Sequence, residues 1–239
     1  MTFKGVLFDF SGTLFRIESA GSWLRAVLAE AGVAVPPDEV RRYAMRLAVA
    51  GALPGGSSPE RVPPDLAGLW ATRDESAERH RAAYTGLARQ VRLPSPVLYD
   101  ALYDRHMTPD AWRPYTDAAE VLGALRREGI GIAVVSNIGW DLRPVFRAHG
   151  LDAFVDAYVL SYEHGIQKPD PRLFRAACEE LGQDPHDVLM VGDDRGADGG
   201  AAELGCSVHF VDHLPVEERP AGLRPVIALA SRGPLRQPR

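Results

Sequence analysis

The feature that most constrains the fold is an alternation of short apolar runs with helical patterns from about residue 116 onward. The apolar runs are GIAVVSN, AYVLSYEHG, VLMVGDD and CSVHFVD, and a further run, KGVLFDF, stands alone near the N-terminus. Strands that alternate with helices in this way are typical of parallel βαβ units. We therefore predict an α/β fold with a doubly wound, Rossmann-like parallel sheet.

The helical patterns between these runs carry clear start and stop signals. Each of three predicted helices has an aspartate at its start and a glycine after its end: Asp117 and Gly129, Asp141 and Gly150, and Asp170 and Gly182. Asp117 with Glu120 has the spacing of a capping box, and Pro171 after Asp170 suits the first helical position. A shorter helix is expected over 199–204. The whole of AYVLSYEHG is expected to be strand.

Residues 17–107 contain almost only helical patterns, broken by the Pro/Gly/Ser-rich loop LPGGSSPERVPPD. This segment separates the first apolar run from the repeating units that follow it. We therefore predict a core formed by residues 1–16 and 108–239, with an inserted helical domain over 17–107. Six residues in or next to this region could face a substrate, although a Trp on a helical stripe is more often core and an exposed Arg is more often solvated: Arg16, Trp23, Arg25, His80, His106 and Trp112.

Composition excludes several classes of protein. The chain has 239 residues and a formal net charge of −5, which provides no field to attract nucleic acid. Cys178 and Cys206 form no CxxC pair, so neither a disulfide framework nor a thiolate zinc site is predicted. No run approaches the 18 apolar residues of a membrane span, and the N-terminal apolar run is too short for a signal peptide. We expect a cytoplasmic protein that binds no membrane, and the oligomeric state is left open.

Polar residues follow the ends of the predicted strands, where open parallel sheets bind their ligands. They lie in four short segments: Asp9 to Thr13, Ser136 with Asn137, Lys168 with Pro169, and Gly192 to Asp194 followed by Asp198. Each segment by itself also fits a plain turn or a helix cap, and Asp198 is equally suited to cap the helix after it. Because all four occur in order on successive strand ends, we expect one joint site.

The residue types at this site suit phosphate chemistry with a metal. Several carboxylates brought to one edge of a sheet repel each other, and Mg²⁺ with oxygen ligands removes that repulsion. Lys168 is a cation able to hold both Asp9 and a phosphate, and Ser136 at a helix start adds a hydroxyl and backbone N–H donors. Asp9 can then attack phosphorus as a carboxylate nucleophile.

The four segments closely resemble the motifs of the haloacid dehalogenase superfamily, which acts mostly as phosphatases. LFDFSGTLF resembles the nucleophile motif, VVSN the phosphate-binding motif, GIQKPDPRLF the lysine motif and VGDDRGAD the acidic metal motif, so that the match covers about 1–16 and 108–215. The resemblance implies Mg²⁺ held by Asp9, the Ser11 carbonyl and Asp193, with Asp194 or Asp198 in support. It also implies substrate binding by Thr13, Ser136, Asn137 and Lys168. The segment 17–107 matches the helical cap that covers such sites.

One residue departs from the phosphatase pattern. Typical members carry, two residues after the nucleophile, a second aspartate that acts as general acid and base, and this chain has Ser11 there. General acid–base help is worth about 100- to 10,000-fold. We therefore expect a Mg²⁺-dependent phosphatase of small phosphorylated metabolites, working through an aspartyl-phosphate and slow on alkyl phosphates. The alternative is a degenerate member that binds metal and phosphate as a regulatory or binding protein.

Two other branches of the family fit less well. Phosphonatase-type members use a cap lysine, and residues 17–107 contain no lysine. The 2-haloacid dehalogenases usually carry a tyrosine at the position of Ser11 and lack the GDD-type metal motif, whereas this chain keeps Asp193 and Asp194. Dehalogenation is therefore a minor alternative.

Overall fold

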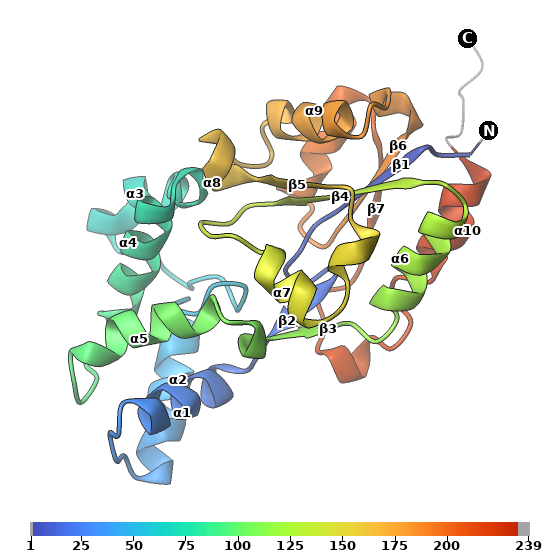
Figure 1. The fold of residues 1–239 in the computed structure, drawn as a ribbon. Helices are drawn as coiled ribbons and strands as arrows, with labels where there is room; N and C mark the ends of the chain where they lie inside the picture. Colours follow the sequence, from blue (N-terminus) through green and yellow to red (C-terminus); the bar gives the residue numbers. More distant parts are fainter. Residues whose placement is uncertain (1, 234–239) are drawn as a thin grey trace.

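A five-stranded parallel sheet forms the centre of the structure, a computed structural model that describes residues 2–233 (Figure 1). Its strand order is β5-β4-β1-β6-β7. The strands are β1 (Gly5–Phe8), β4 (Gly131–Ser136), β5 (Ala157–Leu160), β6 (Val188–Gly192) and β7 (Ser207–Phe210). The chain thus winds outward in both directions from β1, which confirms the predicted doubly wound α/β fold.

Strand β1 lies at the middle of the sheet and is buried along its whole length. Val6 pairs in register with Ile132 of β4 on one side and with Leu189 of β6 on the other. A strand covered on both faces has no polar face, which is why its sequence is an unbroken apolar run. Because β1, β4 and β6 are parallel neighbours, the residues that follow them meet at one edge of the sheet.

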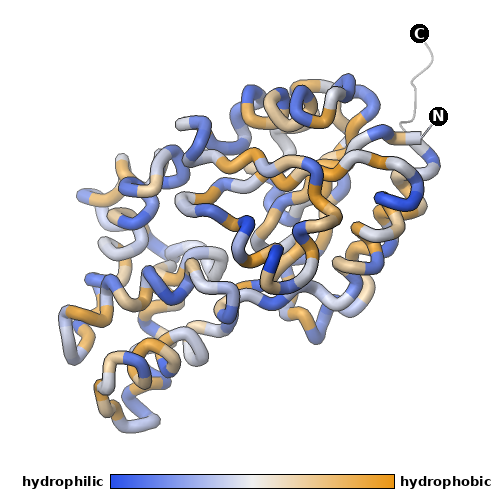
Figure 2. The backbone as a smooth tube through the Cα atoms, viewed as in Figure 1, coloured by the Kyte–Doolittle hydropathy of each residue, from blue (hydrophilic) through white to orange (hydrophobic). Residues whose placement is uncertain are grey.

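Helices cover both faces of the sheet. On one face lie α6 (Ala118–Arg127), α7 (Arg143–Ala148) and α10 (Pro225–Arg232), and on the other lies α9 (Pro171–Glu180) with the 3₁₀ helix η6 (Asp198–Leu204) (Figure 1). Successive residues of a strand point to opposite faces of the sheet. Val6 accordingly packs in the hydrophobic cluster on the face of α6, and Leu7 packs in the cluster on the face of α9. Hydrophobic residues accordingly run along the central strands (Figure 2).

The chain leaves and rejoins this layered structure through a small antiparallel ribbon of β2 (Phe15–Ile17) and β3 (Trp112–Pro114). Between them it forms helices and loops, on the side of the molecule away from α10 (Figure 1). The helices are α1 (Ala20–Glu30), α2 (Pro37–Val49), α3 (Ala67–Ala71), α4 (Ala77–Ala88) and α5 (Val97–His106), with 3₁₀ turns η1 (Pro64–Leu66), η2 (Arg73–Glu75) and η3 (Pro109–Ala111). We call residues 18–111 the helical segment.

Two local expectations were wrong. AYVLSYEHG is strand only to Leu160, and Ser161–His164 form the short helix α8. The capping box at Asp117 does not form, because Asp117 Oδ2 accepts instead from the backbone N–H groups of Leu223, at 2.7 Å, and Arg224, at 3.1 Å. These tertiary donors attach the segment before α10 to the start of α6. The cap at Asp170 is confirmed, since its carboxylate accepts from Arg172 N at 2.9 Å.

The remaining 3₁₀ turns are η4 (Asp152–Phe154), η5 (Pro185–Asp187) and η7 (Val216–Glu218), and the predicted helix over 199–204 is the 3₁₀ helix η6.

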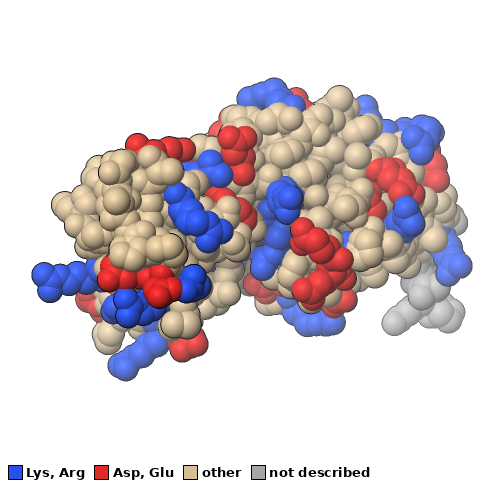
Figure 3. Space-filling model, turned by 90° about the horizontal axis from the view of Figure 1, so that it is seen from below, with Lys and Arg blue, Asp and Glu red and all other residues tan. Residues whose placement is uncertain are grey.

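Within residues 2–233, no helix combines the length and apolar character needed to cross a bilayer. On the face seen in Figure 3, acidic and basic side chains are interspersed.

Candidate active site

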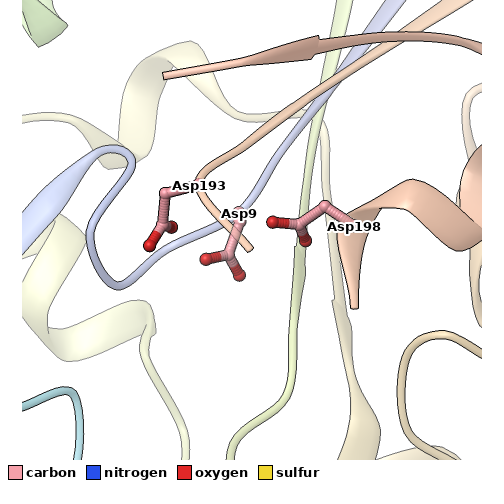
Figure 4. Close-up of side chains that lie close together, drawn as sticks. All are labelled: Asp9, Asp193 and Asp198. Carbon is pink, nitrogen blue, oxygen red and sulfur yellow. The ribbon is translucent and has the colours of Figure 1, made fainter. Parts of the chain in front are cut away.

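Three carboxylates meet at the carboxyl edge of the sheet. Asp9 directly follows β1, Asp193 directly follows β6, and Asp198 begins η6. Each offers an oxygen atom, and these three oxygens all lie within 4.8 Å of one another. Figure 4 shows the side chains converging from their separate segments. Asp9 and Asp198 are buried and Asp193 is nearly so, which makes their mutual repulsion strong.

Lys168 is the buried counter-charge of this cluster. Its Nζ donates to Asp9 Oδ1 at 2.7 Å and to Asp198 Oδ1 at 2.6 Å. Burial by itself lowers the pKa of Lys168, but the two carboxylates raise that pKa above its ordinary value, so the amine stays charged. Burial raises the pKa of Asp9 to about 8, with Asp198 and Asp193 adding to the effect and Lys168 opposing it. One ammonium group therefore does not balance three carboxylates.

Asp193 is held by two donors. Its Oδ1 accepts from Thr13 Oγ1 at 2.9 Å, and its Oδ2 lies 2.5 Å from His213 Nδ1. Burial alone would raise the pKa of Asp193, but His213 and Thr13 bring that pKa below its ordinary value. Thr13, expected to bind substrate, thus has its hydroxyl on Asp193.

Of the two aspartates expected to support the metal, the structure brings Asp198 into the cluster. The Asp194 carboxylate instead accepts from Gly196 N at 2.7 Å and from Ala197 N at 3.0 Å, in the turn that precedes η6. Asp194 N in turn donates to Asp198 Oδ2 at 3.0 Å. Aspartate readily accepts from the backbone N–H groups two and three residues further on, which accounts for the use of the Asp194 carboxylate in this turn.

Ser136 and Asn137 lie at the end of β4, beside Lys168. Ser136 is buried and ends the strand. The Asn137 side-chain amide forms two hydrogen bonds with the backbone of Lys168. Lys168 N donates to Asn137 Oδ1 at 2.6 Å, and Asn137 Nδ2 donates to Lys168 O at 2.9 Å. Asn137, expected to bind substrate, therefore uses its side chain to hold the lysine in place. Sequence reasoning missed this role, because the two residues are 31 positions apart.

The loop after Asp9 is tightly packed. Gly12 has a φ of 82°, and a Cβ there would lie 2.5 Å from Asp193 Oδ2, so only glycine lets the carboxylate approach this closely. The Ser11 hydroxyl donates to the carbonyl of Gly55, at 3.5 Å, in the loop between α2 and η1 of the helical segment. Ser11 thus faces the helical segment with its side chain.

A cleft of about 680 Å³ opens between the helical segment and the residues near 216, with Arg16 among its lining residues. Its other charged side chains are largely paired with each other, with Arg105 Nε 2.8 Å from Glu18 Oε1 and Arg113 Nη1 3.1 Å from Glu217 Oε1. The cleft therefore lacks the unbalanced charge that marks the carboxylate cluster. Trp23 and Trp112 are buried in the hydrophobic core, and His80 and His106 are buried as well.

The structure thus combines a doubly wound α/β sheet with clustered carboxylates and a buried lysine at the carboxyl edge of that sheet. A family model described as haloacid dehalogenase-like hydrolase matches residues 3–204. The chain belongs to this family of hydrolases.

Relatives with curated descriptions include both dehalogenases and phosphatases. The chain is 38% identical over 93 residues to (S)-2-haloacid dehalogenase 4A of Burkholderia cepacia, over 38% of this chain and 40% of that protein. It is 37% identical over 176 residues to the phosphoserine phosphatase of Thermus thermophilus, over 67% of this chain and 66% of that one. The match thus spans less than half of the dehalogenase and about two thirds of the phosphatase.

Solved structures show the same fold. L-2-haloacid dehalogenase from Xanthobacter autotrophicus has a TM-score of 0.61 at 24% identity, over 97% of this chain and 89% of that chain. A HAD phosphatase from Thermococcus onnurineus has a TM-score of 0.55 at 24% identity, over 87% and 86%.

Proposed function

We propose that the protein is a Mg²⁺-dependent phosphatase of small phosphorylated metabolites that works through a phosphorylated Asp9. The observation that carries this proposal is the set of three carboxylates whose oxygens lie within 4.8 Å of each other beside a single ammonium group. A cluster with more carboxylates than ammonium groups favours a bound divalent cation, and phosphoryl transfer makes use of such a cation. The phosphatases among the relatives support the same conclusion.

The residues of the cluster fit Mg²⁺. All three side chains offer oxygen, the donor that this hard cation prefers, and the cluster contains no soft ligand. Asp9 and Asp193 would hold the ion together with the Ser11 carbonyl, and Asp198 would support it beside Lys168. When bound, Mg²⁺ would offset the carboxylate charge and polarise a phosphoryl oxygen.

The chain's own residues would carry two displacements at phosphorus. An Asp9 carboxylate oxygen forms a bond to phosphorus while the bond from phosphorus to the substrate oxygen breaks. Lys168 and the Ser136 hydroxyl would hold the phosphoryl oxygens, which carry the spreading charge. A water then attacks phosphorus and the bond to Asp9 breaks. This step releases inorganic phosphate, regenerates the carboxylate and gives the proton of the water to solvent.

Ser11 cannot serve as an efficient proton donor to the leaving oxygen. A serine hydroxyl is no acid near pH 7, and here it donates to Gly55 O. Leaving groups of low pKa, as in acyl and aryl phosphates, need no proton and should react fastest.

We propose the helical segment as a cap over this site. In support, η2 is tied to the core by Ser161 Oγ donating to Asp74 O at 2.6 Å and by Asp74 N donating to Gln167 Oε1 at 3.2 Å, next to Lys168.

Phosphate release from acetyl phosphate, an aryl phosphate and an alkyl phosphate tests the proposal, with Mg²⁺ and with EDTA. The wild type should hydrolyse the first two with Mg²⁺ only, and Asp9→Asn should be inactive. Ser11→Asp should raise alkyl phosphate turnover by about 100-fold or more. An inactive wild type that gains activity in Ser11→Asp would instead favour a degenerate binding protein. Wild-type rates in Asp9→Asn would overturn the assignment of the nucleophile.

A second candidate is 2-haloacid dehalogenation, favoured by the relatives with that activity. An Asp9 oxygen would attack the carbon that bears the halogen, the carbon–halogen bond would break, and halide would leave before water hydrolyses the resulting ester. Chloride release from 2-chloropropionate in EDTA is the test. Release at a rate that Mg²⁺ does not change, without phosphatase activity, would replace the first proposal with this one.

A further inference from the structure

His213 is the one imidazole that contacts the carboxylate cluster within residues 2–233. It lies in the loop after β7, and its Nδ1 is 2.5 Å from Asp193 Oδ2. Its Nε2 contacts the guanidinium group of Arg16. Because arginine can only donate, Nε2 must accept, and the ring proton is therefore on Nδ1 and is donated to Asp193.

We propose that His213 is a positioning residue that orients Asp193 for metal binding, with Arg16 holding the imidazole in place. This inference rests on the proposed metal site at Asp9, Asp193 and Asp198. It gives a role to two residues, Arg16 and His213, to which the sequence motifs assign none.

The Asp193 carboxylate is fixed at both oxygens. Thr13 Oγ1 donates to Oδ1 at 2.9 Å, while His213 occupies Oδ2. Two donors on opposite oxygens set the plane of a carboxylate, and each oxygen keeps a lone pair for a cation. Partners of this kind, one bond removed from the ion, commonly change metal affinity by about 10- to 100-fold when mutated.

Gly12 provides the space that the contact between His213 and Asp193 requires. A Cβ at Gly12 would lie 2.3 Å from His213 Nδ1, so the imidazole packs directly on the loop that follows the nucleophile. Any side chain at position 12 would push the ring away from Asp193. The contact between His213 and Asp193 thus depends on the same glycine that lets Asp193 approach the loop.

Arg16 joins the imidazole to the helical segment. Its Nη1 donates to Gly55 O at 3.2 Å, the same carbonyl that accepts from Ser11 Oγ. The His213 side chain is 37% exposed, so it needs this second partner to stay in one orientation. A chain of contacts therefore runs from the helical segment through Arg16 and His213 to Asp193.

Binding of Mn²⁺, used as a paramagnetic substitute for Mg²⁺, tests the inference by electron paramagnetic resonance of the free ion, with no substrate present. His213→Ala should weaken binding by about 10-fold, and Arg16→Met should weaken it less. His213→Asn should recover most of the affinity, because its amide N–H lies near the position of Nδ1. His164→Ala, at an exposed histidine of α8, is the matched control and should bind as the wild type does.

Two further measurements separate the outcomes. If the wild type binds no Mn²⁺, or Asp193→Asn binds as tightly as the wild type, the metal site and the proposed function with it are wrong. If Asp193→Asn loses affinity but His213→Ala does not, the metal site stands and the positioning role is wrong. The melting temperature of metal-free His213→Ala should fall only slightly below that of the wild type, because the partly exposed His213 makes one bond to Asp193. A large drop, with no recovery in His213→Asn, would show that His213 acts on the fold and would overturn the inference.

Discussion

Lys168 and Asp9 form a buried ion pair across 159 positions of the chain, with Nζ 2.7 Å from Oδ1. The same ammonium group contacts Asp198, so it joins the residue after β1 to the first residue of η6. Three segments therefore meet at one nitrogen atom. Removing that charge leaves two buried carboxylates without their ammonium partner, which makes Lys168 important for the stability of the fold.

Lys168→Met should lower the free energy of unfolding of the metal-free protein by about 3 kcal/mol, because it leaves buried charge unpaired. Urea denaturation in EDTA measures the loss. Lys4→Met is the matched control, since Lys4 is the only other lysine and its side chain, paired with Asp187, is 62% exposed. The control should lose less than about 1 kcal/mol. Equal losses in both variants would contradict a special role for the buried pair.

Asn137→Asp should displace Lys168 by changing one atom. The new carboxylate still accepts from Lys168 N, but an oxygen replaces the Nδ2 that donates to Lys168 O. Loss of this bond should cost about 1–3 kcal/mol of stability and should lower phosphate turnover. Thermal unfolding and kinetics measure both. Gln183→Glu makes the same chemical change far from the cluster, at an amide that donates to Leu181 O, and should leave turnover unchanged.

Two buried histidines should make the protein acid-sensitive. Burial lowers the pKa of His106 to about 3, and burial together with His106 and Arg73 lowers the pKa of His80 well below its ordinary value of 6.5. A histidine with a lowered pKa in the folded state stabilises the fold above pH 6.5, and this stability is lost as the pH falls toward the folded pKa.

His106→Leu therefore should reduce the slope of stability against pH by up to about 1.4 kcal/mol per pH unit between pH 6.5 and 3. Denaturation curves at several pH values give the slope for the variant and the wild type. Other titrating groups, Asp9 and Asp74 among them, contribute to both curves and largely cancel in the difference. Parallel curves would mean that His106 is not the buried neutral group described here.

Arg219 holds the loop that follows Asp9, although the two residues are far apart in the sequence. It is buried, stacks on the Tyr115 ring, and donates to Gly12 O at 2.6 Å, to Asp212 O at 2.8 Å and to Thr13 O. Arg219→Lys cannot reproduce these forked contacts, and we expect a loss of about 1–3 kcal/mol in urea denaturation. Arg172→Lys, at an exposed pair with Asp170, should change stability by less than about 1 kcal/mol. Wild-type stability in Arg219→Lys would contradict the role of the fork.

Much of the site could be predicted because its positions follow from strand order. Apolar runs mark the strands, polar residues mark their ends, and parallel strands place those ends at one edge. Asp9, Asp193 and Lys168 were found in this way. His213 and Arg219 were not, because they come after the last strand, where no pattern indicates which way the chain returns.

The sequence by itself determined the α/β class and the set of acidic and basic residues at the carboxyl edge, since both depend on local alternation along the chain. Only the tertiary structure decided which residues are partners. It directs Asp198 instead of Asp194 to Lys168, moves the Asp117 carboxylate from its own helix to Leu223 N, and brings the thiols of Cys178 and Cys206 to 4.0 Å. The physical reason is that hydrogen bonds and packing depend on distance in space, and neighbours in space are set by how all the segments pack together.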